Sequence, residues 1–130
     1  MARAYTVATA ALALQVSGKW LDNTLSHFNV QGVTQTRQGI ARKLSIDSLT
    51  ILAIAISIIR TLDAPVRNAI DLATELTRAN GIITIPGGIQ IVIDVQQTTR
   101  VLLERLEHAV EIAPSPRRGR PPQKTTGRLD

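Results

Sequence analysis

Apolar residues recur at helical spacing in two short segments near the start of the chain. Residues 6–14 read TVATAALAL, and Thr6 is placed to cap a helix that begins directly after it. After the turn sequence QVSG, Ser17 is placed to cap a second helix over 18–27. The expected inner faces are formed by Val7, Ala10, Ala11 and Leu14, and then by Leu21, Leu25 and Phe28. Two short helices joined by a tight turn predict a helix-turn-helix with the second helix in the recognition position.

The next segment, 29–44, has no helical periodicity and predicts a β-hairpin wing. Its polar centre reads TQTRQG, and Gly39 can supply the positive φ that a tight turn requires. The predicted wing carries Arg37 at its tip, with Arg42 and Lys43 on its return strand. The wing would therefore place cationic side chains beside the two short helices.

The segment over 46–62 predicts the buried centre of the fold. IDSLTILAIAISIIRTL is apolar nearly all round a helix, and Ser45 is placed to cap it. Asp63 is the expected N-cap of a following helix that has Pro65 in its first turn and ends at the Asn-Gly pair 80–81. The apolar face of that helix consists of Val66, Ala69, Ile70, Ala73 and Leu76. Both helices are expected to pack behind the helix-turn-helix.

A second hairpin and a last helix are predicted before the C-terminal tail. Two β-branched runs, Ile82–Ile85 and Ile89–Ile93, surround a Pro-Gly-Gly turn, and Asp94 is placed to cap a helix over 95–112. The shared apolar face of that helix consists of Val95, Leu102, Leu106, Ala109 and Val110, widened by Thr99 and Leu103. An amphipathic helix beside an apolar hairpin predicts a homodimerisation element. The alternative is that both fold back onto the central helix.

Charge is unevenly distributed along this chain of 130 residues, whose formal net charge is +5. Residues 1–45 carry five basic side chains and one acidic side chain, and residues 114–130 carry the same numbers. Residues 46–113 carry five basic and eight acidic side chains. Basic ends around an acidic middle favour nucleic-acid-binding segments that flank a packing module, with a chance distribution as the alternative.

Composition excludes several kinds of chemistry. Cys is absent, which excludes disulfides, zinc–thiolate sites and thiol catalysis, and the two His residues are too far apart in sequence for a good metal site. We find no carboxylate pair near a histidine, no glycine-rich phosphate loop and no nucleophile with a base, so neither an enzyme nor a cofactor is predicted. The longest apolar run, 49–59, is about half of the ~20 residues that a membrane span requires. With no visible signal peptide, we expect a soluble, cytoplasmic, nucleoid-associated protein.

Several short features over residues 4–80 resemble the DNA-binding domain of MerR-type regulators and their excisionase-like relatives. In those proteins a Tyr-Thr opening precedes the first helix, a Val-Ser turn leads to the recognition helix, an arginine-bearing wing follows, and two helices pack behind. The matching positions are Tyr5-Thr6, Val16-Ser17, Arg37, Arg42 and Asp63-Ala64-Pro65. With the last hairpin and helix, the resemblance implies a mainly α fold: a MerR-like winged helix-turn-helix with a short β-hairpin and a C-terminal amphipathic helix.

The chain departs from that family in two respects. The family usually carries Arg-Tyr-Tyr after the first turn of the recognition helix, where this chain has Asp22-Asn23-Thr24, so its DNA contacts must differ. No effector domain follows, because residues 82–113 are too few and contain no ligating Cys. A metal-sensing or drug-sensing role is therefore not supported.

The tail over 114–130 contains RRGRPP, which resembles the AT-hook. Its prolines exclude helix and central strand, so we expect a thin cationic ribbon that is disordered when free and suits the minor groove of A/T-rich DNA. The resemblance implies that Arg118 and Arg120 point along that groove and that Gly119 lies against its wall. The alternative is a generic solubilising extension.

The candidate DNA contacts fall into three groups. They are Ser17, Lys19, Trp20, Asn23 and Thr24 in the second helix, Arg37, Gln38, Arg42 and Lys43 in the wing, and Arg117, Arg118, Gly119, Arg120 and Lys124 in the tail. Asn23 has the side chain that reads adenine, whereas Trp20 fits a DNA contact and the edge of the core equally well. We expect the remaining arginines to form weak surface pairs with neighbouring acids, namely Arg60, Arg67, Arg78, Arg100 and Arg105.

The sequence thus predicts three parts: a DNA-binding domain over 1–81, a dimerisation element over 82–113 and a basic tail over 114–130. The first functional hypothesis is a homodimeric transcriptional regulator that binds double-stranded DNA with A/T-rich flanks. The second is an architectural protein that bends or coats A/T-rich DNA with little base readout. The third is an antitoxin-like protein-interaction module that holds a protein partner at 82–112.

Overall fold

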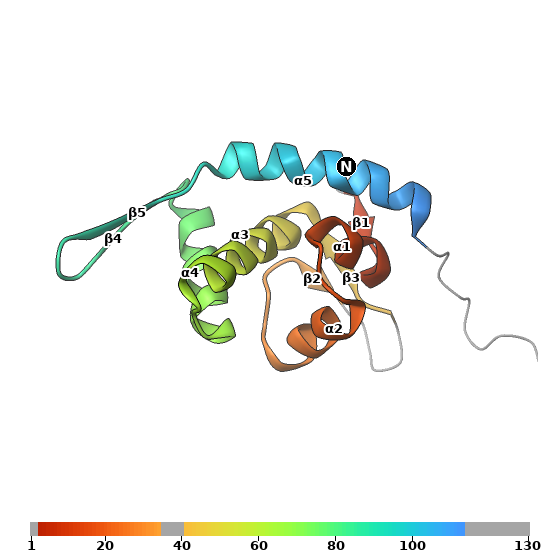
Figure 1. Cartoon of the computed structure of the whole chain (residues 1–130), viewed down its shortest axis with the longest axis horizontal. Coiled ribbons are helices and arrows are strands. Elements are labelled where there is room, and N and C mark those ends of the chain that lie inside the picture. The colour runs from red at the N-terminus through yellow and green to blue at the C-terminus, as the bar shows by residue number, and fades with distance from the viewer. Residues whose placement is uncertain (1–2, 35–40, 114–130) are drawn as a thin grey trace, which may run out of the picture.

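The computed structural model describes residues 3–34 and 41–113, which form a mainly helical fold with a small antiparallel sheet (Figure 1). The helices are α1 (Val7–Leu14), α2 (Gly18–His27), α3 (Ile46–Leu62), α4 (Val66–Arg78) and α5 (Val95–Ile112). The strands are β1 (Ala4–Tyr5), β2 (Val33–Thr34), β3 (Lys43–Ser45), β4 (Ile82–Ile85) and β5 (Ile89–Val92). The prediction of a mainly α fold is confirmed, as are the predicted ranges of α1, α2, α3 and α5.

Side-chain caps fix where four of the helices begin. In each, a hydroxyl or carboxylate oxygen accepts a hydrogen bond from a backbone N–H three residues later, which has no partner inside the helix. The pairs are Thr6 with Thr9, Ser17 with Trp20, Ser45 with Ser48, and Asp94 with Gln97. Four of the five predicted N-caps are thereby confirmed.

The break between α3 and α4 differs from the prediction. Asp63 is the C-cap of α3, with a left-handed φ of 53°, and its N–H donates to the Ile59 carbonyl at 2.8 Å. The N-cap of α4 is Pro65, which makes no side-chain cap bond. Asp63 lies too early to reach the first turn of α4, and aspartate tolerates the left-handed region better than most residues. The predicted N-cap role of Asp63 is therefore wrong.

Helix α3 lies at the centre of the body, as predicted. It packs against α4, α5 and α1, and Figure 1 shows it in the middle of the arrangement with α5 running along one side. Leu49, Leu52 and Ile54 of α3 are fully buried. A helix that is apolar nearly all round is stable in water only when neighbouring elements cover it on several sides, as they do here.

A three-stranded antiparallel sheet with the order β1-β3-β2 joins β1 near the N-terminus to the strands β2 and β3. Leu44 of β3 pairs with Tyr5 of β1 on one side and with Val33 of β2 on the other, and it is fully buried. The sequence did not predict β1, because a strand of two residues forms only where a neighbouring strand supplies its hydrogen bonds. Arg42 was predicted on the return strand, but β3 begins one residue later, at Lys43.

Helix α5 folds back onto the body of its own chain. It packs on α1 and α3, and its buried residues are Leu102, Leu106 and Ala109. Val110 was predicted to share that buried face but is exposed. The fold-back alternative therefore applies to this helix, with α1 as an additional partner that the sequence did not predict.

The β4–β5 hairpin, in contrast, projects away from the body (Figure 1). Its turn contains Gly87 and Gly88, both with positive φ, as the Pro-Gly-Gly sequence predicted. Ile83 pairs with Ile91 and Ile85 with Ile89, so one face of the hairpin consists of isoleucine. The pair nearer the body, Ile83 and Ile91, packs against the core, whereas Ile89 near the turn is 59% exposed.

Candidate nucleic-acid interface

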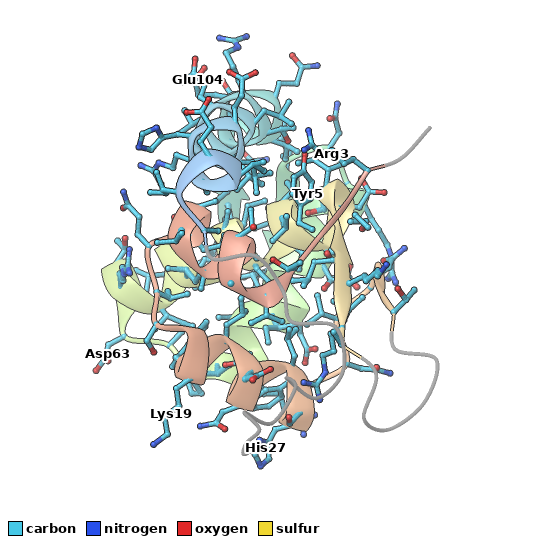
Figure 2. The ribbon with its side chains drawn as sticks, turned by 90° about the vertical axis from the view of Figure 1, so that its right-hand side faces the viewer. Arg3, Tyr5, Lys19, His27, Asp63 and Glu104 are labelled. Atoms are coloured by element: carbon cyan, nitrogen blue, oxygen red, sulfur yellow. The ribbon has the colours of Figure 1, made fainter. Side chains whose placement is uncertain are left out.

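Helix α2 is buried along one side and exposed along the other. Leu21 and Leu25 are buried, while Lys19, Asn23 and His27 are exposed and follow one another at intervals of four residues. Figure 2 shows Lys19 and His27 at the outer surface of this helix. The imidazole Nδ1 of His27 lies 2.7 Å from the carbonyl oxygen of Asn23. Two of the predicted contacts, Lys19 and Asn23, therefore share one accessible face.

The structure places two other predicted contacts of α2 away from that face. Thr24 is only 5% exposed, and its hydroxyl donates to the Trp20 carbonyl at 2.8 Å. Thr24 was predicted as a DNA contact, but its position on the helix lies beside the inward-facing Leu21 and Leu25, so it belongs to the buried side. Trp20 is half-buried and packs against the core, which agrees with the core-edge alternative.

Ser17 acts at the start of α2 through its hydroxyl, whose Oγ accepts the Trp20 N–H at 3.0 Å. We expect Ser17→Ala to lower the free energy of unfolding by about 1 kcal/mol, because alanine removes this acceptor from the first turn. The matched control is Ser57→Ala, at an exposed position of α3, which should change it by less than ~0.5 kcal/mol. Urea unfolding followed by circular dichroism measures both, and equal losses would contradict the capping role.

Arg42 connects the segment before β3 to α2. Its guanidinium donates to Oδ1 of Asp22 at 3.2 Å and to Oγ of Ser26 at 3.1 Å, and its side chain is only 20% exposed. These bonds offset the negative charge that Asp22 places on the surface of α2. Arg42 therefore holds this segment against α2, whereas the neighbouring Lys43 is exposed on β3.

We expected two arginines in surface ion pairs, but they contact residues that flank α2 in the sequence. Arg60 of α3 donates to the carbonyl of Gln15, in the turn before α2, at 2.8 Å. The guanidinium of Arg67 lies 5.5 Å from the ring centroid of Phe28, the C-cap of α2. Charge patterning along the sequence could not identify either partner, because neither is acidic. Within the described residues, Arg78 is the one of the five arginines that makes the expected ion pair.

Arg3 is a further basic residue near the three-stranded sheet. Arg3 lies just before β1, and its guanidinium is 5.3 Å from the ring centroid of Tyr5, which belongs to that strand. In the antiparallel register Arg3 lies beyond the Ala4–Ser45 pair, at the other end of the strand pair from Lys43. Figure 2 shows Arg3 far from Lys19 and His27, so Arg3 does not extend the exposed face of α2.

Seven predicted contacts lie outside the described residues. They are Arg37 and Gln38 in the wing, and Arg117, Arg118, Gly119, Arg120 and Lys124 in the tail. Across residues 3–34 and 41–113, no three His, Asp or Glu side chains are grouped so that they could hold a metal ion. Among the helices of the same ranges, none has both the length and the apolar character needed to cross a membrane.

Comparisons of the chain with protein-family models, with curated proteins and with solved structures find no match. The resemblance of short features over 4–80 to MerR-type regulators therefore stays a prediction.

Proposed function

We propose that this protein binds double-stranded DNA as a homodimeric transcriptional regulator with a winged helix-turn-helix. The observation that carries the proposal is the two-sided character of α2. Its inner side is anchored by Leu21 and Leu25, and its outer side presents Lys19 and Asn23 to solvent. A helix held in this way has the diameter to enter the major groove, where asparagine can read adenine and lysine can bind guanine or phosphate.

The surroundings of α2 support this assignment electrostatically. Asp22 is the one acidic residue within α2, and its carboxylate is paired with Arg42. Lys43, directly after Arg42, adds positive charge on β3. A surface that approaches DNA needs cations at its edges to contact phosphates, and Lys43 would supply one.

The tail would extend the contact into the neighbouring minor groove. Its five cationic side chains and its RRGRPP sequence suit an A/T-rich groove, which is narrow and strongly negative. Because the tail follows α5 directly along the chain, its local concentration near DNA bound by α2 would be high. The tail would thus raise affinity and add a preference for A/T-rich flanks.

The test is fluorescence-anisotropy binding across a salt series with the full chain and with a chain that ends at Ala113. The probes are a random-sequence duplex pool, an A/T-rich duplex and a G/C-rich duplex. We expect the full chain to prefer A/T-rich DNA, and we expect truncation to remove that preference and weaken binding about tenfold or more at low salt. Absence of binding by either chain at moderate salt would overturn the proposal.

A single substitution separates groove recognition from general electrostatics in the tail. We expect Arg120→Ala to weaken binding to A/T-flanked sites by about fivefold, corresponding to about 1 kcal/mol, and to weaken G/C-flanked binding less. Arg128→Ala removes the same charge outside RRGRPP and serves as the matched control. An equal loss on both kinds of DNA would reduce the tail to a general anchor.

The β4–β5 hairpin supports the homodimer in this proposal. An isolated two-stranded hairpin is marginally stable in water, and this one carries an isoleucine face whose outer pair, Ile85 and Ile89, extends beyond the body of the chain. A second copy related by a two-fold axis would cover this face with the same face. Two copies of α2 would then be available for two successive half-sites on DNA.

Sedimentation velocity tests this contact with two neighbouring substitutions in β5. We expect Ile89→Lys to shift the protein to a monomer, because the charge would be buried between the two isoleucine faces. Gln90→Lys is the matched control, since Gln90 is exposed and points to the opposite face of the hairpin. If the Ile89→Lys variant remained a dimer, the dimer contact would have to lie outside the isoleucine face of the hairpin.

One observation favours an architectural DNA-binding protein as a second candidate. With Thr24 buried and Arg42 bonded to Asp22, α2 offers few side chains for base readout. A protein of this kind would bind many A/T-rich duplexes with similar affinity. Footprinting on a promoter-containing pool distinguishes the two, because a discrete protected site requires base readout and uniform coverage does not.

A further inference from the structure

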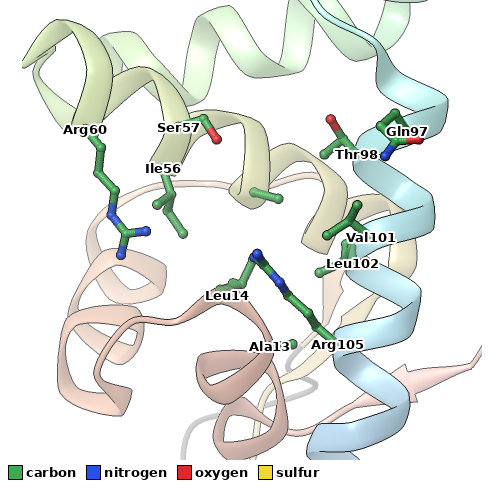
Figure 3. A pocket seen from close by; sticks show the side chains of 11 residues that line it. Ala13, Leu14, Ile56, Ser57, Arg60, Gln97, Thr98, Val101, Leu102 and Arg105 are labelled. Carbon is green, nitrogen blue, oxygen red and sulfur yellow. The ribbon is translucent and has the colours of Figure 1, made fainter.

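A pocket of about 280 Å³ lies where α1, α3 and α5 meet, away from the exposed face of α2. Its apolar walls include Leu14 of α1, Ile56 of α3 and Leu102 of α5. Figure 3 shows Arg105 reaching from α5 into the pocket and Arg60 approaching from α3. The pocket thus combines hydrocarbon walls from three helices with two guanidinium groups. Small-molecule sites commonly have such mostly apolar walls with a few polar groups.

The charge of the lining has a single sign. Arg60 and Arg105 are the only ionisable residues that line the pocket in the described structure, and no carboxylate accompanies them. Within residues 3–34 and 41–113, Arg105 forms no ion pair. Ser57 adds a hydroxyl at the same wall as Arg60. The pocket therefore offers hydrogen-bond donors to an anion, with an apolar interior beside them.

Three other polar groups of the lining already make a hydrogen bond within the fold. The hydroxyl of Thr98 donates to the Asp94 carbonyl at 3.0 Å, and Oε1 of Gln97 accepts from Arg100 at 3.0 Å. Arg60 gives one nitrogen to the Gln15 carbonyl. The guanidinium of Arg105 is therefore the principal group left for a ligand, and its planar fork matches a carboxylate.

We propose that this pocket binds a small organic carboxylate with a short apolar body. The carboxylate would accept hydrogen bonds from Arg105, and the hydrocarbon part would lie against Leu14, Ile56 and Leu102. A monoanion suits the site better than a phosphate dianion, because a single unengaged guanidinium beside apolar walls offers few donors for a second charge. The site is distinct from the DNA-binding surface, so the proposal holds independently of it.

Occupancy would join three helices that belong to different parts of the chain. Arg60 already bonds the turn before α2, and Arg105 lies on α5. A ligand held between them would stabilise the docking of α5 on the rest of the fold, since binding to the folded state alone raises its stability. A rise in the thermal midpoint therefore accompanies binding in this proposal.

The experiment is a titration of the uniformly ¹⁵N-labelled full chain with sodium benzoate and with sodium butyrate, at constant ionic strength. Benzamide, the neutral counterpart of benzoate, is titrated in parallel. We expect saturable shifts of amide signals from α1, α3 and α5 with the carboxylates, and at least about tenfold weaker binding of benzamide, because the charge-assisted bond is lost. Failure of both carboxylates to saturate, or equal affinity for benzamide, would overturn the proposal.

Two exposed arginines of α5 provide a matched pair of variants. Arg105→Gln should weaken benzoate binding about tenfold or more. Arg100→Gln removes the same charge from the same helix and frees Oε1 of Gln97, but Arg100 does not line the pocket, so benzoate binding should stay within about twofold. Ser57→Leu, which would fill the pocket from an exposed position, should also abolish binding while the circular dichroism spectrum stays unchanged. Equal weakening by Arg100→Gln and Arg105→Gln would contradict a specific carboxylate site at Arg105.

Discussion

Replacing Leu52 with alanine is expected to lower the free energy of unfolding by about 3 kcal/mol. Leu52 is 0% exposed and lies in the middle of α3, which packs against α4, α5 and α1. The substitution removes buried methyl groups and leaves a cavity that the surrounding helices cannot fully close, because each is held by its own contacts. For a domain of this size, the thermal midpoint should fall by roughly 10 °C or more.

The matched control lies ten residues further along the same helix. Leu62 is 66% exposed, so Leu62→Ala should change the free energy of unfolding by less than ~0.5 kcal/mol. Urea unfolding followed by circular dichroism measures both variants at one protein concentration, because a dimer would make stability depend on concentration. A loss at Leu62 as large as the loss at Leu52 would contradict the assignment of α3 as the buried centre.

Replacing Gly81 with alanine is expected to destabilise the protein by about 3 kcal/mol. Gly81 has a φ of +95°, and a Cβ atom there would collide with the backbone carbonyl oxygen of Ile93. The residue is also fixed by its hydrogen bonds, since its N–H donates to the Leu76 carbonyl and its carbonyl accepts the Ile93 N–H, each at 2.7 Å. Strain at this point cannot be relieved without moving the base of the hairpin away from α4.

Gly87 is the matched control for that substitution. Its φ of +101° is as unfavourable for alanine, but an added Cβ would have no neighbour within 4 Å. Gly87→Ala should therefore cost about 1 kcal/mol, from the backbone conformation alone. Sedimentation velocity adds a functional readout, because displacement of the hairpin by Gly81→Ala should also weaken the proposed homodimer. Equal costs at the two glycines would show that the close approach of Ile93 is unimportant.

The proposals for DNA and for a carboxylate ligand concern separate surfaces of one small fold. The exposed side of α2 carries Lys19 and Asn23, while the pocket with Arg105 lies against α5. Arg60 is the residue that connects them, since it lines the pocket and bonds the carbonyl of Gln15 before α2. Measurements on Arg105 therefore test the ligand site without altering the groups proposed to contact DNA.

Several tertiary features had no local signal in the sequence. Strand β1 exists because Tyr5 meets Leu44 across the sheet. The guanidinium of Arg60 finds a backbone carbonyl, which no pattern of charged residues reveals. Thr24 is buried because the helix that carries it turns that side towards the core, although threonine is compatible with either side.

The sequence by itself determined the helices and the starting points of all but α4, because these depend on local chemistry. Thr6, Ser17, Ser45 and Asp94 each satisfy a backbone N–H within the next three residues, and apolar spacing determines which side of each helix is inward. The tertiary structure alone decided which surfaces meet, namely that α5 packs on α1 while only the base of the β4–β5 hairpin contacts the body. That choice depends on which apolar faces fit together in space, and residues far apart in the chain contribute to it jointly.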